Sequence, residues 1–223
     1  MAVPEKYLAS FIPGGFYHIY NRTNNKEKLF RENKDKFLFL EKFEEYLFPY
    51  VRIYAFCLLD DHFHFIVSVR EQSEIVAYVN TIEKEDLTLK EEYLMRNLEE
   101  DLWLNYFIEW QFLRFFTSYA MYFNRSYGRK GQLFHRPFKR VKIEGEEQFL
   151  QAIIYVHHNP VKHRLVQKLE DYVWSSFNKI LSGGSSFLES EYVLKLFGGK
   201  ELFVKIHQSQ NKNFDDHSFY MEE

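Results

Sequence analysis

The chain contains a single cysteine, Cys57, which lies in the apolar run of residues 53–59. A lone thiol cannot form a disulfide within the chain, so the sequence does not indicate a disulfide framework or an oxidising compartment. A reactive thiol needs a cationic and partly open site, whereas this apolar run predicts burial. We therefore interpret Cys57 as a core residue.

Long apolar segments are also missing. No window approaches about 18 uninterrupted apolar residues, so we expect no membrane-spanning segment and no membrane partner. The first ten residues have no apolar stretch behind a basic start, which predicts no signal peptide and hence a cytoplasmic location. With 223 residues, of which 46% are hydrophobic and 27% charged, the chain has the composition of an ordinary globular protein with one good core.

Acidic residues are absent from one stretch of the chain. Residues 110–143 carry eight Lys or Arg and no acid, whereas residues 71–109 carry eleven acidic residues against three basic ones. The net charge of −3 argues against a protein that coats duplex nucleic acid. Such a local asymmetry is nevertheless typical of a polyanion site within a near-neutral protein. Two solvated helix faces of opposite sign would give the same pattern.

Hydrophobic periodicity and turn signals predict the order strand, helix, strand, strand, helix, strand, helix. This order predicts an α+β fold, a ferredoxin-like antiparallel sheet with helices packed on one face. We expect the last helix to end near Pro160, because the residue before a proline resists the α conformation. The predicted elements are residues 15–20, 34–48, 51–59, 62–69, 102–122, 138–143 and 146–156.

Two further parts of the chain complete the predicted organisation. Residues 71–101, acidic and weakly periodic, are expected to form a helical insertion or lid within a domain that covers residues 1–180. A Ser-Gly-rich linker begins near residue 181, and two short elements near residues 191–195 and 201–207 precede a polar tail. Residues 181–223 are therefore expected to form a linker, a short helical extension and a flexible tail.

His62 and His64 lie two residues apart in the predicted strand at residues 62–69. Side chains alternate across a strand, so both imidazoles point to one face and Phe63 and Phe65 to the other. Two imidazoles on one face can chelate a divalent metal. A His-x-His pair on a strand is, however, more often two half-exposed polar residues, so this pair alone is a weak signal.

Tyr155 and Asn159 form the second candidate group. Positions i and i+4 share a helix face, so these two side chains look in one direction, and His158 at i+3 could contribute. A tyrosine in a helix is ordinarily a core residue, and with 16 tyrosines in the chain Tyr155 alone means little. The nearby amide oxygen ligand and the basic strand upstream make a functional role more plausible.

The two groups fit one chemistry. A tyrosine hydroxyl, with a pKa of about 10, is a poor nucleophile at neutral pH unless its target is activated. A divalent metal, Mg²⁺ or Mn²⁺, held by two imidazoles and one amide oxygen keeps open positions for phosphate oxygens and acts as a Lewis acid on the phosphate. Attack by Tyr155 would then give a phosphotyrosyl link and release a hydroxyl end.

The sequence around these residues resembles the REP-associated tyrosine transposases, a branch of the single-tyrosine His-hydrophobic-His transposases of insertion sequences. The resemblance covers roughly residues 14–180, with four motifs in the family's order. The matching segments are YHIYNRTNNKEKLF at 17–30, FCLLDDHFHFIV at 56–67, GRKGQLFHRPFKR at 128–140, and YVHHNPVKHRLV at 155–166 with DYVWSSF at 171–177.

The resemblance implies Tyr155 as the nucleophile and His62, His64 and Asn159 as metal ligands. It also implies a ferredoxin-like nuclease domain and single-stranded or imperfect-hairpin DNA as the partner. Relatives include both monomers and homodimers, so the chain is expected to be one or the other.

The sequence departs from the family pattern at a few positions. Asp60-Asp61 stands where Pro-Asn is common, Thr23 where Gly is common, and His158 where Leu is typical. Asp61 could add a metal ligand or simply cap the turn. None of these changes removes a reacting group.

Basic residues of three segments are candidates for DNA contacts, because Lys and Arg neutralise backbone phosphates. The alternative for the strand residues is a solvated edge strand, on which lysines discourage aggregation. A plain turn role is an equal alternative for Arg22. The candidates are Arg22, Arg129, Lys130, Arg136, Lys139, Arg140 and Lys142.

Two rival functions remain open at this point. One is a relative of the same fold that binds hairpin DNA but has a metal site too weak to cut. The other is a metal-dependent phosphoesterase that uses His62 and His64 but not Tyr155. A covalent protein–DNA adduct would separate a tyrosine nucleophile from both.

Overall fold

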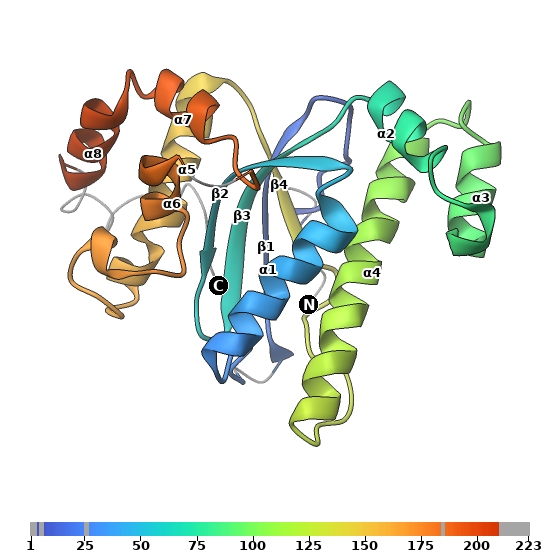
Figure 1. Cartoon of the computed structure of the whole chain (residues 1–223), viewed down its shortest axis with the longest axis horizontal. Helices are drawn as coiled ribbons and strands as arrows, with labels where there is room; N and C mark the ends of the chain where they lie inside the picture. The colour runs from blue at the N-terminus through green and yellow to red at the C-terminus, as the bar shows by residue number, and fades with distance from the viewer. Residues whose placement is uncertain (1–3, 5–6, 25–26, 184–185, 210–223) are drawn as a thin grey trace.

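Four antiparallel strands form one sheet at the centre of the molecule (Figure 1). The structure is a computed structural model, and it describes residues 4, 7–24, 27–183 and 186–209. The order across the sheet is β2-β3-β1-β4, which places β1 and β3 in the middle. The strands are β1 (Phe16–Arg22), β2 (Val51–Leu58), β3 (His62–Val69) and β4 (Lys139–Ile143).

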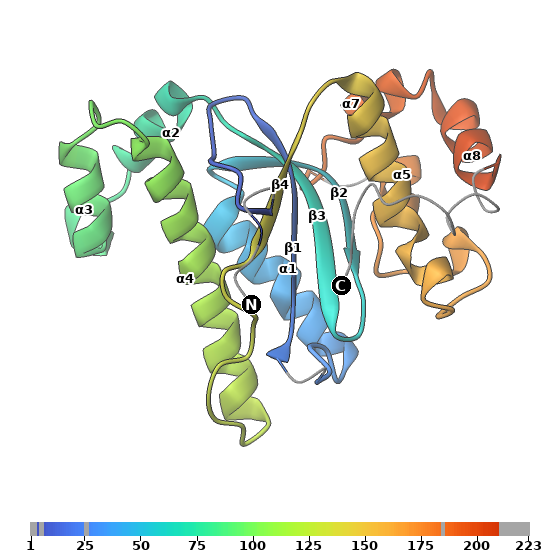
Figure 2. The ribbon, with the colours of Figure 1, turned by 180° about the vertical axis from the view of Figure 1, so that it is seen from behind.

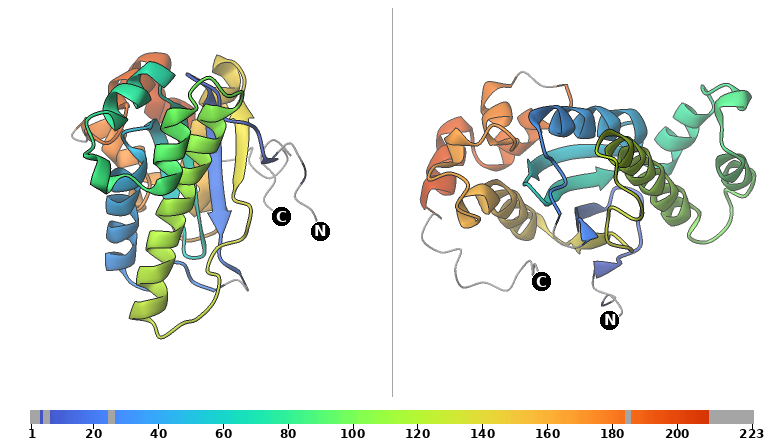
Figure 3. Two further views of the ribbon diagram at one scale, coloured as in Figure 1. Left: turned by 90° about the vertical axis from the view of Figure 1, so that its right-hand side faces the viewer. Right: turned by 90° about the horizontal axis from the view of Figure 1, so that it is seen from below.

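Helices α1 (Asn33–Leu47) and α4 (Trp103–Ser126) cover one face of this sheet and pack on each other (Figure 3). Phe63 and Phe65 of β3 point to this side, where their rings meet Phe39 and Phe43 of α1 at centroid distances of 4.9 and 4.1 Å. All four rings are fully buried, and burying each side chain contributes about 1.5–3 kcal/mol. This face is therefore an aromatic core.

Helix α5 (Glu146–Lys162) lies on the opposite face, against β2 and β3 (Figure 3). The predicted α+β class and antiparallel ferredoxin-like sheet are confirmed, and the prediction of helices on one face holds for α1 and α4. The position of α5 differs from that prediction. β3 is buried on both faces except at His62, so its second face also needs a covering element, and α5 provides it.

Helix α5 also continues through Pro160, contrary to the prediction that it would end there. A proline removes one backbone donor, but the turn still closes around it, since the amides of His163 and Leu165 donate to the carbonyls of Asn159 and Pro160 at 2.9 and 2.8 Å. Residues 152–160 of α5 are all buried. Tertiary packing therefore outweighs the local preference of the residue before the proline.

The acidic insertion is helical, as expected, and comprises α2 (Gln72–Val79), the 3-10 helix η3 (Lys84–Asp86) and α3 (Leu89–Arg96). It lies beside the N-terminal end of α4 (Figure 2). The buried carboxylate of Glu91 accepts hydrogen bonds from Thr88 at 2.6 Å and Gln111 at 2.7 Å and pairs with Arg114. Burial alone would raise the pKa of Glu91, but these hydrogen bonds and the guanidinium hold it below its ordinary value. The acidic insertion is thus fastened to the basic stretch of α4.

The C-terminal part adds η4 (Leu169–Asp171), α6 (Phe177–Ser182), α7 (Ser190–Leu196) and α8 (Lys200–Ser209). The two short elements predicted after the linker correspond to α7 and α8. Residues 184–185 of the predicted linker and residues 210–223 of the predicted tail lie outside the described residues. Within the described part of the chain, no helix combines the length and apolarity that a membrane crossing requires. Cys57 is fully buried, which confirms its interpretation as a core residue.

Candidate active site

His62 and His64 project from β3 toward the face that α5 covers, opposite to Phe63 and Phe65, as strand alternation predicts. Their ring centroids are 5.3 Å apart and the ring planes are nearly perpendicular. His64 is fully buried, while the side chain of His62 keeps 12% of its surface exposed. One imidazole therefore lies at the floor of the site and the other at its opening.

Each of these two rings is oriented by a neighbour through its Nδ1 atom. Nδ1 of His62 lies 2.6 Å from Oδ1 of Asp61, and Nδ1 of His64 lies 2.8 Å from Nε2 of His18 on β1. The hydrogen bond from His62 lowers the pKa of Asp61. Partners on Nδ1 are the usual way in which proteins fix a metal-binding histidine with its Nε2 atom toward the metal. Asp61 thus orients His62, which neither of its two predicted roles anticipated.

Tyr155 enters the site from α5, and Asn159 follows one helical turn further along the same helix. The Tyr155 ring stands perpendicular to the His64 ring at a centroid distance of 5.8 Å and lies 5.9 Å from the His18 ring. Tyr155 is 7% exposed and Asn159 is fully buried. Tyr155 reaches the histidines, as predicted, and Asn159 lies at the i+4 position, on the same side of the helix.

Asn159 carries an unusual polar atom. Its Nδ2 donates to the Tyr155 carbonyl at 3.1 Å, whereas its buried Oδ1 has no hydrogen-bond partner among the described residues. A buried acceptor left without a partner costs about 1–3 kcal/mol. The fold keeps this amide oxygen in place despite that cost, as expected for an atom that binds something.

The donor set of this site suits a divalent metal. It offers two imidazole nitrogens and one amide oxygen, a mixture compatible with Mg²⁺, Mn²⁺ or Zn²⁺. Within the described ranges, no group of three or more His, Cys, Asp or Glu side chains could hold a metal ion. A metal at His62 and His64 would therefore depend on the Asn159 amide for its third protein ligand.

A cavity of about 240 Å³ opens beside His62 and Asp61. Three of the predicted DNA-binding residues line it, namely Arg22, Arg136 and Lys139. The remaining lining residues come from separate loops and strands. They are Tyr20, Asn21, His135, Pro137 and His163.

A larger groove of about 790 Å³ follows α4 and the segment from Gly131 to Phe138. It is lined by exposed aromatic and apolar side chains of α4, including Tyr106, Leu113 and Met121. Asn21, His135, Arg136 and Pro137 line both the groove and the smaller cavity, so the two adjoin.

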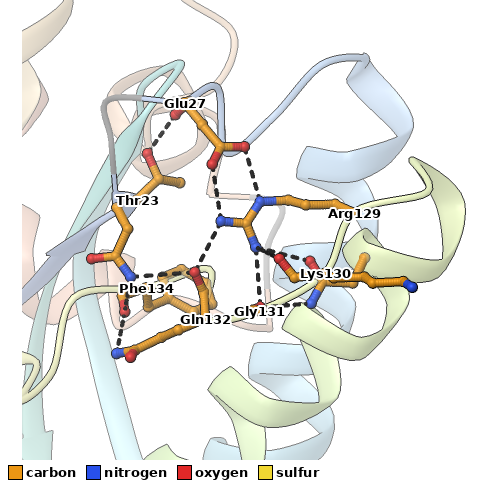
Figure 4. A network of polar contacts seen from close by, with 9 residues as sticks. Thr23, Glu27, Arg129, Lys130, Gly131, Gln132 and Phe134 are labelled. Carbon is orange, nitrogen blue, oxygen red and sulfur yellow. Dashed lines mark hydrogen bonds and ion pairs between the residues drawn. The ribbon is translucent and has the colours of Figure 1, made fainter.

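Two predicted DNA-binding residues are held inside the protein instead. Arg129 forms a two-pronged ion pair with Glu27, with both N–O distances at 2.9 Å, and also donates to loop carbonyls (Figure 4). Arg140 is 8% exposed, pairs with Glu109 and donates to the Ala9 carbonyl at 2.7 Å. Their guanidinium groups are thus engaged by the fold, and we do not propose phosphate contacts for them.

The other two predicted cations lie at the surface. Lys130 is exposed, and Lys142 lies 3.4 Å from Glu144 with 41% of its side chain exposed. Neither lines the cavity or the groove. The acid-free stretch at residues 110–143 therefore serves partly for internal ion pairing and only partly for an exposed basic surface.

Sequence reasoning missed Lys162 and misplaced His158. The ammonium of Lys162 lies 5.2 Å from the centroid of the Tyr155 ring. His158 points away from the site, and its Nε2 lies 2.9 Å from the carbonyl oxygen of His207. The seven-residue spacing from Tyr155 to Lys162 was a signal for Lys162, since it corresponds to two helical turns.

Comparisons with known proteins agree with this fold. Residues 14–112 match the family described as "Transposase IS200 like". A curated protein of Haemophilus influenzae, named as a REP-associated tyrosine transposase, is 23% identical over 184 residues, which cover 78% of this chain and 86% of that protein. The solved structure of a REP-associated tyrosine transposase bound to a REP hairpin shares 18% identity and a TM-score of 0.53, covering 82% of this chain and 87% of that one.

The fold and the matched segment thus define a protein similar to the IS200-like transposases. Within that group, the resemblance to the REP-associated tyrosine transposases that the sequence predicted is confirmed.

Proposed function

We propose that this chain is a divalent-metal-dependent transposase that cuts single-stranded or hairpin DNA with Tyr155 as nucleophile. The observation that supports this most directly is the meeting of two elements. α5 brings Tyr155 against His64 of β3, and Asn159, one helical turn further along α5, carries a buried Oδ1 atom with no hydrogen-bond partner among the described residues. The similarity to transposases supports the same reading.

In this proposal His62, His64 and Asn159 hold Mg²⁺ or Mn²⁺. Once bound, the metal supplies Lewis-acid activation of the scissile phosphate. The protein supplies the orientation, since Asp61 and His18 fix the two imidazoles and the Tyr155 carbonyl fixes the amide.

Tyr155 performs the covalent step of the proposed reaction. Its phenolic oxygen forms a bond to phosphorus while one phosphorus–oxygen ester bond breaks. The phenolic proton is lost, and the departing strand takes up a proton to end in a hydroxyl group. The Lys162 ammonium beside the Tyr155 ring would stabilise the negative charge that develops on the phenolic oxygen.

The proposed DNA path follows the two adjoining hollows. Arg22, Arg136 and Lys139 in the smaller cavity would neutralise phosphates next to the scissile one. The groove along α4 would receive unstacked bases, because aromatic and apolar side chains suit their faces. The similar transposase solved with a REP hairpin supports hairpin DNA as the substrate class.

A covalent-adduct assay tests this proposal. Wild-type protein with Mn²⁺ and an oligonucleotide that carries a hairpin and a single-stranded flank should give an adduct that survives denaturing electrophoresis. Mass spectrometry should locate the nucleotide on the peptide with Tyr155. The Y155F variant removes one oxygen, so it should bind DNA with unchanged affinity and form no adduct.

Tyr78→Phe is a matched control, since this tyrosine is 42% exposed and lines neither the cavity nor the groove. It should cut at the wild-type rate. Cutting without an adduct would indicate a water-using phosphoesterase, and binding without cutting would indicate a binding-only relative. Either result would overturn the proposed mechanism.

A further inference from the structure

A second cluster of histidines lies behind the candidate site. His157 and His158 are located on α5 between Tyr155 and Asn159, but both point away from the metal site toward His207 of α8. His157 and His207 are fully buried and His158 is 3% exposed. The helix that carries the proposed nucleophile is therefore tied from behind to a C-terminal helix almost 50 residues further along the chain.

The contacts in this cluster fix which atom carries each proton. Nδ1 of His207 lies 2.7 Å from the Phe203 carbonyl, which can only accept, so this nitrogen donates. A neutral imidazole has one donor and one acceptor. Nε2 of His207 must therefore accept, at 2.9 Å, from Nδ1 of His157.

The same reasoning continues on the other side of His157. Its Nε2 atom must accept, at 2.7 Å, from the hydroxyl of Ser176. The Ser176 oxygen in turn accepts from the backbone amide of Phe56 on β2 at 2.9 Å. The result is a one-directional hydrogen-bond relay from β2 through Ser176 and His157 to His207, defined here as the histidine relay.

In this arrangement both relay histidines are neutral, because each uses one ring nitrogen as a donor and the other as an acceptor. Burial accordingly lowers the pKa of His207 to about 3 and the pKa of His157 well below its ordinary value. His158, which also faces His207, has its pKa lowered by burial to about 4. The rings of Phe203 and Phe177 pack on His207 at centroid distances of 4.2 and 5.2 Å.

The relay acts close to Pro160 in α5. Pro160 has no backbone N–H to donate, so one hydrogen bond of the helix ladder is missing directly after Asn159. The relay holds the back of the same turn to β2 on one side and to α8 on the other. Rotation of α5 about its axis, which would move Tyr155 relative to His64, would break these bonds.

We propose that His207 is a positioning residue, which through the histidine relay fixes the orientation of Tyr155 and Asn159 toward the metal site. The expected effect of His207 on DNA cutting rests on the proposed function. The restraint that the relay places on α5 does not depend on that function. Misplacement of reacting groups by about 1 Å costs about 100-fold in rate. The C-terminal extension would then be part of the active machinery.

Three full-length variants test the role of His207. H207F keeps an aromatic ring but removes the relay bond, whereas H207Q retains an oxygen that can accept from His157. F203L, the matched control, loosens the packing of α8 and leaves every relay atom in place. We expect H207F to form the adduct at least about tenfold more slowly, with unchanged DNA affinity. H207Q should recover most of the rate, and F203L should keep the wild-type rate at a temperature where every variant is folded.

Amide hydrogen exchange of residues 155–162 gives a readout that does not depend on cutting. Exchange should be faster in H207F and near the wild-type rate in H207Q, even if the wild-type protein forms no adduct. Failure of the proposed function can therefore be distinguished from failure of the positioning role of His207. If H207F does not fold, Ser176→Ala decides by the same two measurements. Unchanged exchange and unchanged rate in a folded H207F or S176A variant would overturn the proposal, as would equal slowing in F203L.

Discussion

Replacing Asn159 by leucine should make the metal-free protein more stable while removing its response to metal. The Oδ1 atom of Asn159 is buried without a hydrogen-bond partner among the described residues. Leucine has a similar size and no polar atom, so it removes this acceptor from the core. The substitution also removes the bond from Nδ2 to the Tyr155 carbonyl, which counts against the gain.

The size of the effect follows from these two contributions. Removing the partnerless acceptor should contribute about 1–3 kcal/mol, and losing the hydrogen bond should cost about 0.5–1.5 kcal/mol. The net gain in the free energy of unfolding is therefore about 1 kcal/mol. In a chain of this size each kcal/mol raises Tm by about 2–4 °C.

Metal should stabilise the wild-type protein by linkage. At a free concentration of 100 times Kd the stabilisation is about 2.7 kcal/mol, which corresponds to about 5–10 °C in Tm. In N159L one of the three proposed protein ligands is lost, so this shift should shrink toward zero. The conservative variant N159D should retain the shift, since a carboxylate oxygen is a good ligand for Mg²⁺ or Mn²⁺.

Thermal unfolding with and without Mn²⁺, followed by circular dichroism, measures both effects. N159D should show the opposite metal-free behaviour, because it buries a charge. An N159L variant that is destabilised by more than about 2 kcal/mol without metal, yet keeps the full metal shift, would refute the reasoning. It would show that the amide is a structural group and that the metal, if bound, lies elsewhere.

Two further predictions concern charge. R136E combined with K139E should weaken binding of single-stranded DNA and lower the log–log salt slope by about 0.7 for each lost contact. R140E should instead lower Tm through loss of the internal pair with Glu109 and leave the salt slope unchanged. A fluorescence titration of DNA binding at several salt concentrations distinguishes R140E from the double variant. An unchanged slope in the double variant would place the DNA elsewhere. The second prediction uses the lowered pKa of His207. His207 takes up a proton near pH 6.5 in the unfolded chain but only near pH 3 in the folded protein. The contribution of neutral His207 to the free energy of unfolding is therefore fully present above pH 6.5 and falls as the pH drops from 6.5 to 3. The loss should be at most about 1.4 kcal/mol per pH unit for this residue, and denaturant unfolding of H207F should show a shallower dependence than wild type; equal slopes in both proteins would contradict it.

Most of the fold could be predicted from local patterns in the sequence. The alternation around His62 and the helical period of residues 34–48 follow from which residues must face the core, so the order of the elements was correct. The two faces of the sheet were harder to assign. The sequence of β3 places apolar residues on both faces beyond His64, but it does not show which helix covers the second face.

The candidate site was predictable where its residues lie close together along the chain. The pair His62 and His64 and the pair Tyr155 and Asn159 each form a local motif, and the structure brings Tyr155 to His64. The partners of Arg129 and Arg140 could not be predicted, because Glu27 and Glu109 lie 102 and 31 positions away along the chain. Long-range pairing decides whether a basic residue serves the fold or a ligand.

The sheet separates the residues that stabilise the protein from the residues proposed to do chemistry. One face buries the phenylalanine rings of β3, α1 and α4, while the other carries the histidines and meets Tyr155. Because side chains alternate along β3, each position belongs to only one of these two surfaces. Substitutions on the α5 side could therefore alter the proposed chemistry while the aromatic side keeps the domain folded.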